Sequence, residues 1–348
     1  MLRRQFLAAA GAAVAPAFVG AANKSGSALP RVGTGEHTYE VRNDFFKKPD
    51  SIEWQTTHNV AVDADGLIYI THEGDRSKRK KGLDPVVVFD HKGKFVRSFG
   101  KDWHGAGHGI DVRRENNEDY LYHCNPWLDH HKVVKTTLTG EMVWKLERPE
   151  CPEYADPKKP YSPTNISFNP DGGFTVGDGY GSHHMLVYSA DRKLLKVYGS
   201  QGHGDGQFVT PHGNWTDLRD PANPKTIVCD RANGRLQTFT IDGKFLSKTE
   251  KGTVLFPANV DIRGDVLMCA DVFSRISLFD KAGKPIVNLG DDQAWRENVQ
   301  KKNIRANSQL WENGKFVTPH DACFDAAGNI LVAEWVEGGR LIHLKKVG

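Results

Sequence analysis

Four histidines recur at matched places along the chain, and their residue type and spacing suit a metal site. His58, His108, His212 and His320 each stand at the start of a segment in which apolar and polar residues alternate. Neutral imidazole binds transition metals, and three histidines with an open fourth position are a ligand set of catalytic zinc. Whether these residues meet depends on how the segments that follow them are arranged.

Those segments belong to a repeat. The clearest copy runs from His58 to His72, with Asp-Ala-Asp-Gly between two strand-like segments, and it continues through residues 86–100. Segments of alternating apolar and polar residues, bounded by Gly, Asp and Asn turns, are typical of β-hairpins. Six units of four such strands predict an all-β, six-bladed β-propeller. The other copies follow at spacings of 50, 56, 48, 46 and 62 residues and start at His108, Thr164, His212, Ala258 and His320.

The ends and insertions of the repeat set the expected domain organisation. The last unit ends after its third strand, and residues 36–44 form a strand-like segment outside every unit. We expect this segment to supply the missing strand, so that residues 23–348 form one domain. The Pro-rich residues 148–162 are expected on the surface. Residues 291–314, which include Arg305, are expected to form a loop or helix that covers one mouth of the channel or lies on the surface.

Aligning the units places one residue from each at the start of its innermost strand, facing the central axis. His108, His212 and His320 fall in the second, fourth and sixth units. Alternate blades face the axis from three evenly spaced directions, so the three imidazoles are expected to converge and hold zinc. A single histidine here would more often hydrogen bond only to backbone, and by affinity the set also accepts Cu²⁺, Ni²⁺, Co²⁺ or Fe²⁺.

A second register, meaning one matched position in each unit, lies where the next strand of each unit ends. An Asp at such a position commonly closes a turn by hydrogen bonding to backbone. His72 and His123 depart from this habit and could face the channel. The register consists of His72, His123, Asp178, Asp230, Asp271 and Glu334.

Several short motifs around these positions resemble a known family. They are Gly107-His108-Gly109, Asp178-Gly-Tyr180, Pro-His212 followed by Asp230-Arg231-Ala-Asn-Gly-Arg235, and Pro-His320-Asp321. Together they resemble the peptidyl-α-hydroxyglycine α-amidating lyase family within the NHL-repeat propellers. The resemblance implies zinc on the three histidines, Tyr180 as the base, Arg231 as a catalytic residue and a structural calcium held partly by Asp321.

The physical chemistry of these residue types agrees with the resemblance. A free tyrosine has a pKa of about 10 and is a weak base at neutral pH. A neighbouring arginine and a divalent metal both favour the phenolate form. A phenolate can take the proton of a carbinolamine-type hydroxyl, and a metal can polarise a substrate oxygen.

Two departures from the family pattern concern the substrate. Glu73 stands where the family has an arginine that contacts substrate, which reverses the local charge, and Thr318 replaces a methionine. Arg76 or Arg79 in the adjacent loop could restore the positive charge. We therefore predict a metal-dependent lyase-like enzyme acting by C–N or C–O elimination on a hydroxylated or carbonyl small molecule. The residues expected to bind this substrate are His58, His72, Glu73 and Asn165.

Two other functions stay open on the sequence. A non-catalytic NHL propeller would serve as a binding or scaffold protein of the cell envelope and would bind no metal. A calcium-dependent lactonase-like hydrolase would use carboxylate and amide oxygens, for which Asn165, Asn259 and Glu73 are candidates, although three histidines suit zinc better than calcium.

The remaining features concern location and partners. Residues 1–22 carry Arg3-Arg4 before a short apolar stretch, which resembles a Tat export signal and predicts a periplasmic protein without stable membrane insertion. The 46 basic and 43 acidic residues give a net charge of +3 with no long run of one sign, which disfavours nucleic acid as a partner. One or two disulfides are possible, which the spacing cannot pair. The five cysteines are Cys124, Cys151, Cys229, Cys269 and Cys323.

Overall fold

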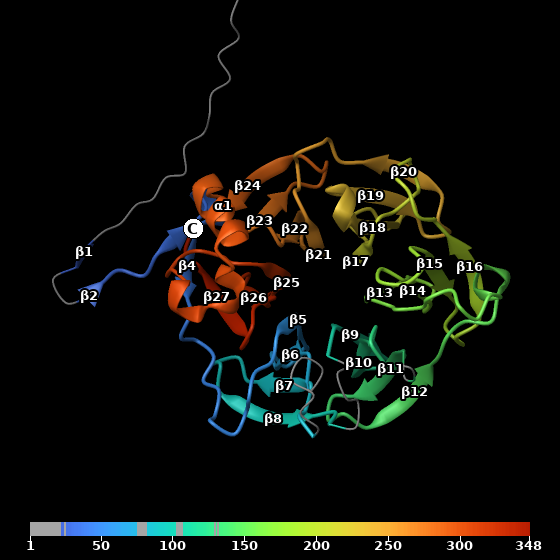
Figure 1. The fold of residues 1–348 in the computed structure, drawn as a ribbon, viewed down its shortest axis with the longest axis horizontal. Coiled ribbons are helices and arrows are strands. Elements are labelled where there is room, and N and C mark those ends of the chain that lie inside the picture. The colour runs from blue at the N-terminus through green and yellow to red at the C-terminus, as the bar shows by residue number, and fades with distance from the viewer. Residues whose placement is uncertain (1–21, 24–25, 75–81, 102–106, 129, 131) are drawn as a thin grey trace, which may run out of the picture.

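The computed structural model describes residues 22–23, 26–74, 82–101, 107–128, 130 and 132–348. Six antiparallel sheets stand in a ring around a central channel, which confirms the predicted six-bladed β-propeller (Figure 1). Arg76 and Arg79, and residues 1–21 of the expected export signal, lie outside the described residues. None of the helices in the described part of the chain is long and apolar enough to cross a membrane.

Each of the first five blades is a four-stranded meander whose first strand lines the channel. The first three blades consist of β5 (Thr57–Val62), β6 (Ile68–His72), β7 (Val86–Phe89) and β8 (Phe95–Phe99); β9 (Gly109–Glu115), β10 (Glu118–Cys124), β11 (Val133–Thr137) and β12 (Met142–Leu146); and β13 (Asn165–Phe168), β14 (Phe174–Gly177), β15 (Met185–Tyr188) and β16 (Leu194–Tyr198). The fourth and fifth consist of β17 (Pro211–Asp217), β18 (Lys225–Asp230), β19 (Arg235–Thr240) and β20 (Phe245–Lys248), and of β21 (Pro257–Arg263), β22 (Val266–Asp271), β23 (Arg275–Phe279) and β24 (Pro285–Leu289).

The sixth blade joins the two ends of the propeller. Its order is β25 (Pro319–Phe324), β26 (Ile330–Glu334), β27 (Arg340–Lys346), β4 (Tyr39–Arg42) and β3 (Arg31–Val32). β4 pairs antiparallel with β27, so the N-terminal segment supplies the strand missing from the last repeat, as predicted. A separate pair, β1 (Ala22–Asn23) and β2 (Gly26–Ser27), lies away from the ring, and η1 spans Gly35–His37.

The repeated Asp-x-x-Gly phrase forms the tight turn between the first two strands of blade 1. The Asp63 carboxylate accepts hydrogen bonds from the backbone N–H groups of Asp65 and Leu67, at 3.0 and 2.8 Å. Gly66 completes the turn at a φ of 81°, a conformation that favours glycine. The strands on either side are mostly buried and rich in β-branched residues, and their apolar side chains form the cores between blades.

The two insertions pack against the ring. In residues 291–314, α1 (Gln293–Lys301), η4 (Ile304–Ala306) and η5 (Ser308–Leu310) lie on the side of blade 6, and Trp295 and Ile304 bury themselves against Val317 and Val336. In residues 148–162, which we expected at the surface, η2 (Pro152–Tyr154) buries the tyrosine at its end. All five cysteines are free thiols, so no disulfide links the described residues.

Candidate metal centre and catalytic site

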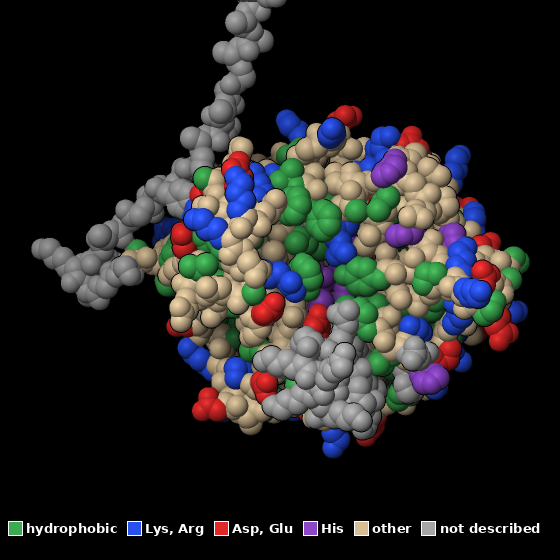
Figure 2. Space-filling view, viewed as in Figure 1, with side chains coloured by type: hydrophobic (Ala, Val, Ile, Leu, Met, Phe, Trp, Pro, Cys, Tyr) green, Lys and Arg blue, Asp and Glu red, His purple; other side chains and the backbone are tan. Residues whose placement is uncertain are grey.

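The four register histidines meet on the propeller axis. His58, His108, His212 and His320 are each at most 2% exposed, and they come from blades 1, 2, 4 and 6. Their ring centroids lie 5.0 Å apart for His108–His212 and for His108–His320, and 4.6 Å apart for His212–His320. Figure 2 shows histidine side chains at the bottom of the central opening on one face of the molecule. The three histidines expected to bind metal are therefore brought together.

The same backbone contact orients each of these three imidazoles. Nδ1 of His108 lies 2.9 Å from the Thr164 carbonyl oxygen, and Nδ1 of His212 lies 2.7 Å from that of Ala258. Nδ1 of His320 lies 3.1 Å from the carbonyl oxygen of His58. Since a carbonyl only accepts, each Nδ1 carries the proton and each Nε2 presents a lone pair. Fixing a ligand in this way through its second nitrogen is characteristic of metal-binding histidines.

Two glycines allow this contact. A side chain at Gly109 would overlap the Thr164 carbonyl oxygen, and one at Gly213 would overlap the Ala258 carbonyl oxygen. Both carbonyls are the acceptors for the preceding histidines, His108 and His212. The Gly after each of these histidines thus lets the next blade approach closely enough to hold the ring.

Burial keeps the three imidazoles neutral. Removal from water lowers the pKa of His108, His212 and His320 well below the usual value of 6.5, and the neighbouring imidazoles and Arg231 lower it further. Nε2 of His320 is buried and makes no hydrogen bond to any described residue. A neutral imidazole with an unused lone pair fits a metal ion.

Tyr180 and Arg231 stand directly beside the histidines. The Tyr180 hydroxyl lies 2.9 Å from His212 Nε2 and 3.3 Å from His108 Nε2. Arg231 Nη1 donates to the same hydroxyl at 3.2 Å, and its guanidinium lies over the Tyr180 ring at 5.2 Å. The two predicted catalytic residues therefore share one hydrogen-bonded contact with two of the predicted ligands.

The second-register acids position the loops that carry these two residues. The Asp178 carboxylate accepts hydrogen bonds from Ser162 N and Ser182 N and from the Tyr154 hydroxyl, each at 2.6 Å. Tyr154 belongs to the Pro-rich insertion, so that insertion braces the Tyr180 loop. The Asp230 carboxylate likewise holds the Arg231 loop, accepting from Val209 N, Asn233, Arg235 and Gln237.

The structure places His72 differently from our expectation. Its Nδ1 accepts from the backbone N–H groups of Gln55 and Gly74 at 3.4 and 3.3 Å, and its Nε2 lies 2.7 Å from the Asp84 carbonyl oxygen. His72 therefore does in blade 1 what Asp178 and Asp230 do in blades 3 and 4, and both of its ring nitrogens contact backbone groups. His123, its counterpart in blade 2, contacts Thr136 Oγ1 at 3.1 Å.

The other predicted substrate contacts divide between two levels of the channel. Glu73 Oε1 lies 3.4 Å from His58 Nε2, beside the histidines. Asn165 instead donates to Asn259 Oδ1 at 2.9 Å and lines a cavity of about 160 Å³ together with Asp111, Asp261 and Asp321. The structure thus places Asn165 with the predicted calcium residue Asp321 and not with Tyr180.

The cavity around Asp111, Asp261 and Asp321 has the features of a cation site. Burial raises the pKa of Asp321 to about 7 and that of Asp261 to about 6, and burial together with these two carboxylates raises that of Asp111. Asn165 Oδ1 is buried without a hydrogen-bond partner among the described residues. Carboxylate and amide oxygens are the ligands that Ca²⁺ prefers.

Two residues near the site were not identified as site residues from the sequence. The Trp127 ring lies 5.2 Å from His58 and 5.3 Å from His108, and it stacks on Tyr180 at 6.3 Å and 20°. It follows the second strand of its blade, as Tyr180 and Arg231 do in theirs, and this shared loop position could have identified it. Arg305 lies over the Trp335 ring at 3.3 Å and donates to the Trp335 carbonyl oxygen.

Arg305 lines a cavity of about 360 Å³ together with Phe256 and Thr318. Burial lowers the pKa of Arg305, while the carboxylates of Glu337 and Glu73 oppose that shift. Phe256 and Phe273 stack at 5.1 Å on another wall, and Arg231 lies over Phe256 at 5.3 Å. The insertion at residues 291–314 therefore forms one wall of a cavity, and Phe256 on another wall contacts Arg231.

The buried histidines His72 and His123 predict acid sensitivity. Burial lowers the pKa of His72 to about 4 and that of His123 to about 3, against 6.5 in the unfolded chain. As the pH falls below 6.5, these histidines are protonated in the unfolded chain before they are protonated in the folded protein. Their contribution to the free energy of unfolding is therefore complete above pH 6.5, and it falls by about 1.4 kcal/mol per pH unit for each histidine toward pH 4. The free energy of unfolding, measured with denaturant at several pH values in this range, should decrease less steeply with falling pH in His123→Gln than in the wild type. The exposed His203→Gln variant should keep the wild-type slope, and equal slopes in all three proteins would contradict the assignment.

Comparison with known proteins agrees with the fold. No family model matches the chain. Mouse peptidyl-glycine alpha-amidating monooxygenase is 26% identical over 244 residues, which is 61% of this chain and 24% of that protein. Human NHL repeat-containing protein 3 is 27% identical over 256 residues, which is 68% of this chain and 67% of that protein. The chain thus spans about a quarter of the length of the amidating monooxygenase.

A solved structure gives the same architecture. Inactivated virginiamycin B lyase from Staphylococcus aureus, crystallised with quinupristin, superimposes with a TM-score of 0.55 over 89% of this chain and 100% of that one, at 13% identity. At that identity the likeness concerns the fold alone. The repeat, the ring of six sheets and the NHL-repeat relatives together show that the chain is a six-bladed β-propeller with NHL-repeat homologues.

Proposed function

We propose that the protein is a metal-dependent lyase that cleaves a C–N or C–O bond at a hydroxylated carbon of a small molecule. The observation that carries this proposal is the contact of Tyr180 with two buried, backbone-oriented histidines and with Arg231. A scaffold protein has no need of a phenol, a guanidinium and imidazole lone pairs converging on one buried point.

His108, His212 and His320 would hold the ion, which the family resemblance suggests is zinc. When bound, a divalent ion supplies Lewis acidity that polarises a substrate oxygen. The oxygen-lined cavity around Asp321 would hold a structural Ca²⁺.

The chain's own residues account for the proton transfers. Tyr180, as phenolate, accepts the proton of the substrate hydroxyl, and Arg231 stabilises the negative charge on the phenolic oxygen. As the oxygen forms a carbonyl, the bond from the same carbon to nitrogen breaks and its electron pair goes to the nitrogen. The leaving nitrogen needs one proton, and Tyr180 returns to it the proton taken from the hydroxyl. The reaction therefore requires no other reactant.

The cavity lined by Arg305 and Phe256, the ring on which Arg231 lies, suits the rest of the substrate. The stacked pair Phe256–Phe273 offers an apolar wall, and Arg305 has two terminal nitrogens that make no hydrogen bond to a described residue. A substrate with an apolar group next to the reacting carbon and a carboxylate within reach of Arg305 fits this wall. N-acyl-α-hydroxyglycines have these parts and serve as test substrates.

Metal content tests this proposal. Protein purified without an affinity tag should contain about one transition-metal ion per chain at the axial site. The His108→Ala/His212→Ala variant should lose it and should no longer release aldehyde from an N-acyl-α-hydroxyglycine, because two ligands are gone. The exposed His203→Ala variant is the matched control and should keep both properties.

The opposite result would favour the non-catalytic alternative. Wild-type protein without transition metal, or with metal that the double variant retains, would leave a binding propeller as the better account. We also propose export to the periplasm through the twin-arginine segment, which cell fractionation of the full-length chain would test.

A further inference from the structure

We propose that His58 is a fourth ligand of the axial metal, so that the site is a four-histidine centre suited to an ion that takes five or six ligands. This inference rests on the proposed function, since it concerns the same ion. It assigns to His58 a role other than the substrate contact expected from the sequence.

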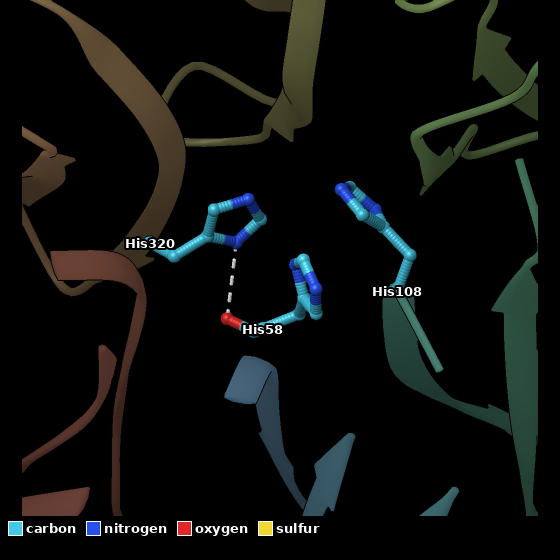
Figure 3. Close-up of side chains that lie close together, drawn as sticks. All are labelled: His58, His108 and His320. Carbon is cyan, nitrogen blue, oxygen red and sulfur yellow. Dashed lines mark hydrogen bonds between the residues drawn. The ribbon is translucent and has the colours of Figure 1, made fainter. Parts of the chain in front are cut away.

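The position of the imidazole nitrogens carries the inference. One nitrogen from each of His58, His108 and His320 lies within 4.8 Å of the others, and all three residues are buried. Figure 3 shows the three rings pointing toward one another from separate blades of the channel. The His58 ring centroid lies 4.9 Å from that of His108 and 4.8 Å from that of His320.

These separations match those of the three expected ligands. His212 stands 5.0 and 4.6 Å from the same two histidines, His108 and His320. His58 and His212 are therefore equivalent with respect to the shared pair. They come from blades 1 and 4, so an ion held between His108 and His320 is approached by His58 from one side and by His212 from the other.

The surroundings of His58 also suit a ligand. The Glu73 carboxylate, 3.4 Å from Nε2, is placed to orient the ring, and carboxylates commonly do this for metal-bound histidines. The His58 carbonyl oxygen meanwhile accepts the hydrogen bond that orients His320. One residue thus holds a neighbouring ligand through its backbone and presents its own imidazole to the same point.

A fourth imidazole changes which ion the site suits. Tetrahedral zinc with four protein ligands is a closed, structural site that leaves no position for substrate. Imidazole also suits Fe²⁺, Co²⁺ and Ni²⁺, which accept more ligands than four and so keep room for a substrate oxygen. We therefore infer that the resident ion belongs to this second group and is not the zinc that the family resemblance suggests.

Titration of metal-stripped protein with Co²⁺ and with Zn²⁺ tests the assignment without relying on activity. For His58→Ala we expect Co²⁺ affinity to fall by about tenfold or more, with a smaller loss for Zn²⁺. The visible absorption of bound Co²⁺ should also become more intense, because a lower coordination number strengthens these bands. Glu73→Gln should weaken Co²⁺ binding in the same direction, and His203→Ala should change neither affinity nor spectrum.

The outcomes separate the two proposals. Wild-type affinity and an unchanged Co²⁺ spectrum in His58→Ala would overturn the fourth ligand and leave the three-histidine enzyme standing. Absence of Co²⁺ binding by wild-type protein would overturn both. Thermal unfolding of the metal-free proteins identifies a His58→Ala chain that is merely misfolded, and in that case His58→Gln is titrated and read by the same two outcomes.

Discussion

Replacing Tyr180 by Phe is expected to lower kcat by about 10²–10⁴-fold, the usual contribution of a positioned general base, while the bound metal stays in place. Phe keeps the ring that stacks on Trp127 and removes only the hydroxyl that contacts His108, His212 and Arg231. The measurement is aldehyde release from an N-acyl-α-hydroxyglycine, combined with metal analysis of the same preparation.

Tyr120 provides the matched control for this variant. Its hydroxyl bonds to the Glu118 carboxylate on the outside of blade 2, so Tyr120→Phe loses one phenolic hydroxyl without touching the channel. Its kcat should equal that of the wild type. Retained activity in Tyr180→Phe would exclude the phenol as the base, and loss of the metal would show that the hydroxyl serves the metal site instead.

The arrangement of Arg231 decides how the phenol can act. Its Nη1 donates to the Tyr180 hydroxyl, while its Nε is buried without a hydrogen-bond partner among the described residues. One guanidinium can thus stabilise the phenolic oxygen and still offer a donor to an oxygen of the substrate. The same residue lies over Phe256, on the wall of the neighbouring cavity, so it joins the reacting centre to the place proposed for the substrate.

The parts of the site that follow the repeat could be predicted from the sequence. Inner strands start at a regular spacing, so the register of His108, His212 and His320 determines that they face the axis. The closing strand followed from the same regularity, because the last repeat lacked one strand and residues 36–44 were left over. Tyr180 and Arg231 came from the family motifs and lie in the loops that carry the site.

The parts that depend on side-chain direction or on non-repeated loops could not be predicted. His72 occupies a position where the other blades have His123 or an acid, and the sequence does not show that its ring turns toward backbone groups. Asn165 follows Thr164 by one residue and lines the cavity around Asp321. Arg305 sits in an insertion outside the repeat, so no register predicts its approach to Glu73.

Replacing Gly213 by Ala is expected to destabilise the protein by about 1–3 kcal/mol and to weaken metal binding, although no ligand is altered. The new methyl group would overlap the Ala258 carbonyl oxygen and the Asn259 side-chain oxygen, so blade 5 must move away from blade 4. That movement would lengthen the 2.7 Å contact by which Ala258 orients His212, and the Nε2 lone pair would lose its fixed direction.

Gly204 is the matched control for this change. A methyl group there would approach Gln207 Oε1 at 2.9 Å, the end of a flexible side chain that can turn aside at an exposed position. Gly204→Ala should therefore keep wild-type unfolding and metal affinity, measured by denaturant unfolding and by Co²⁺ titration. If Gly213→Ala is destabilised yet binds Co²⁺ as tightly as the wild type, the carbonyl contact is a packing feature of the two blades. If both properties fall together, the backbone of one blade holds the ligand of the next, and the metal site and the ring of blades depend on the same contact.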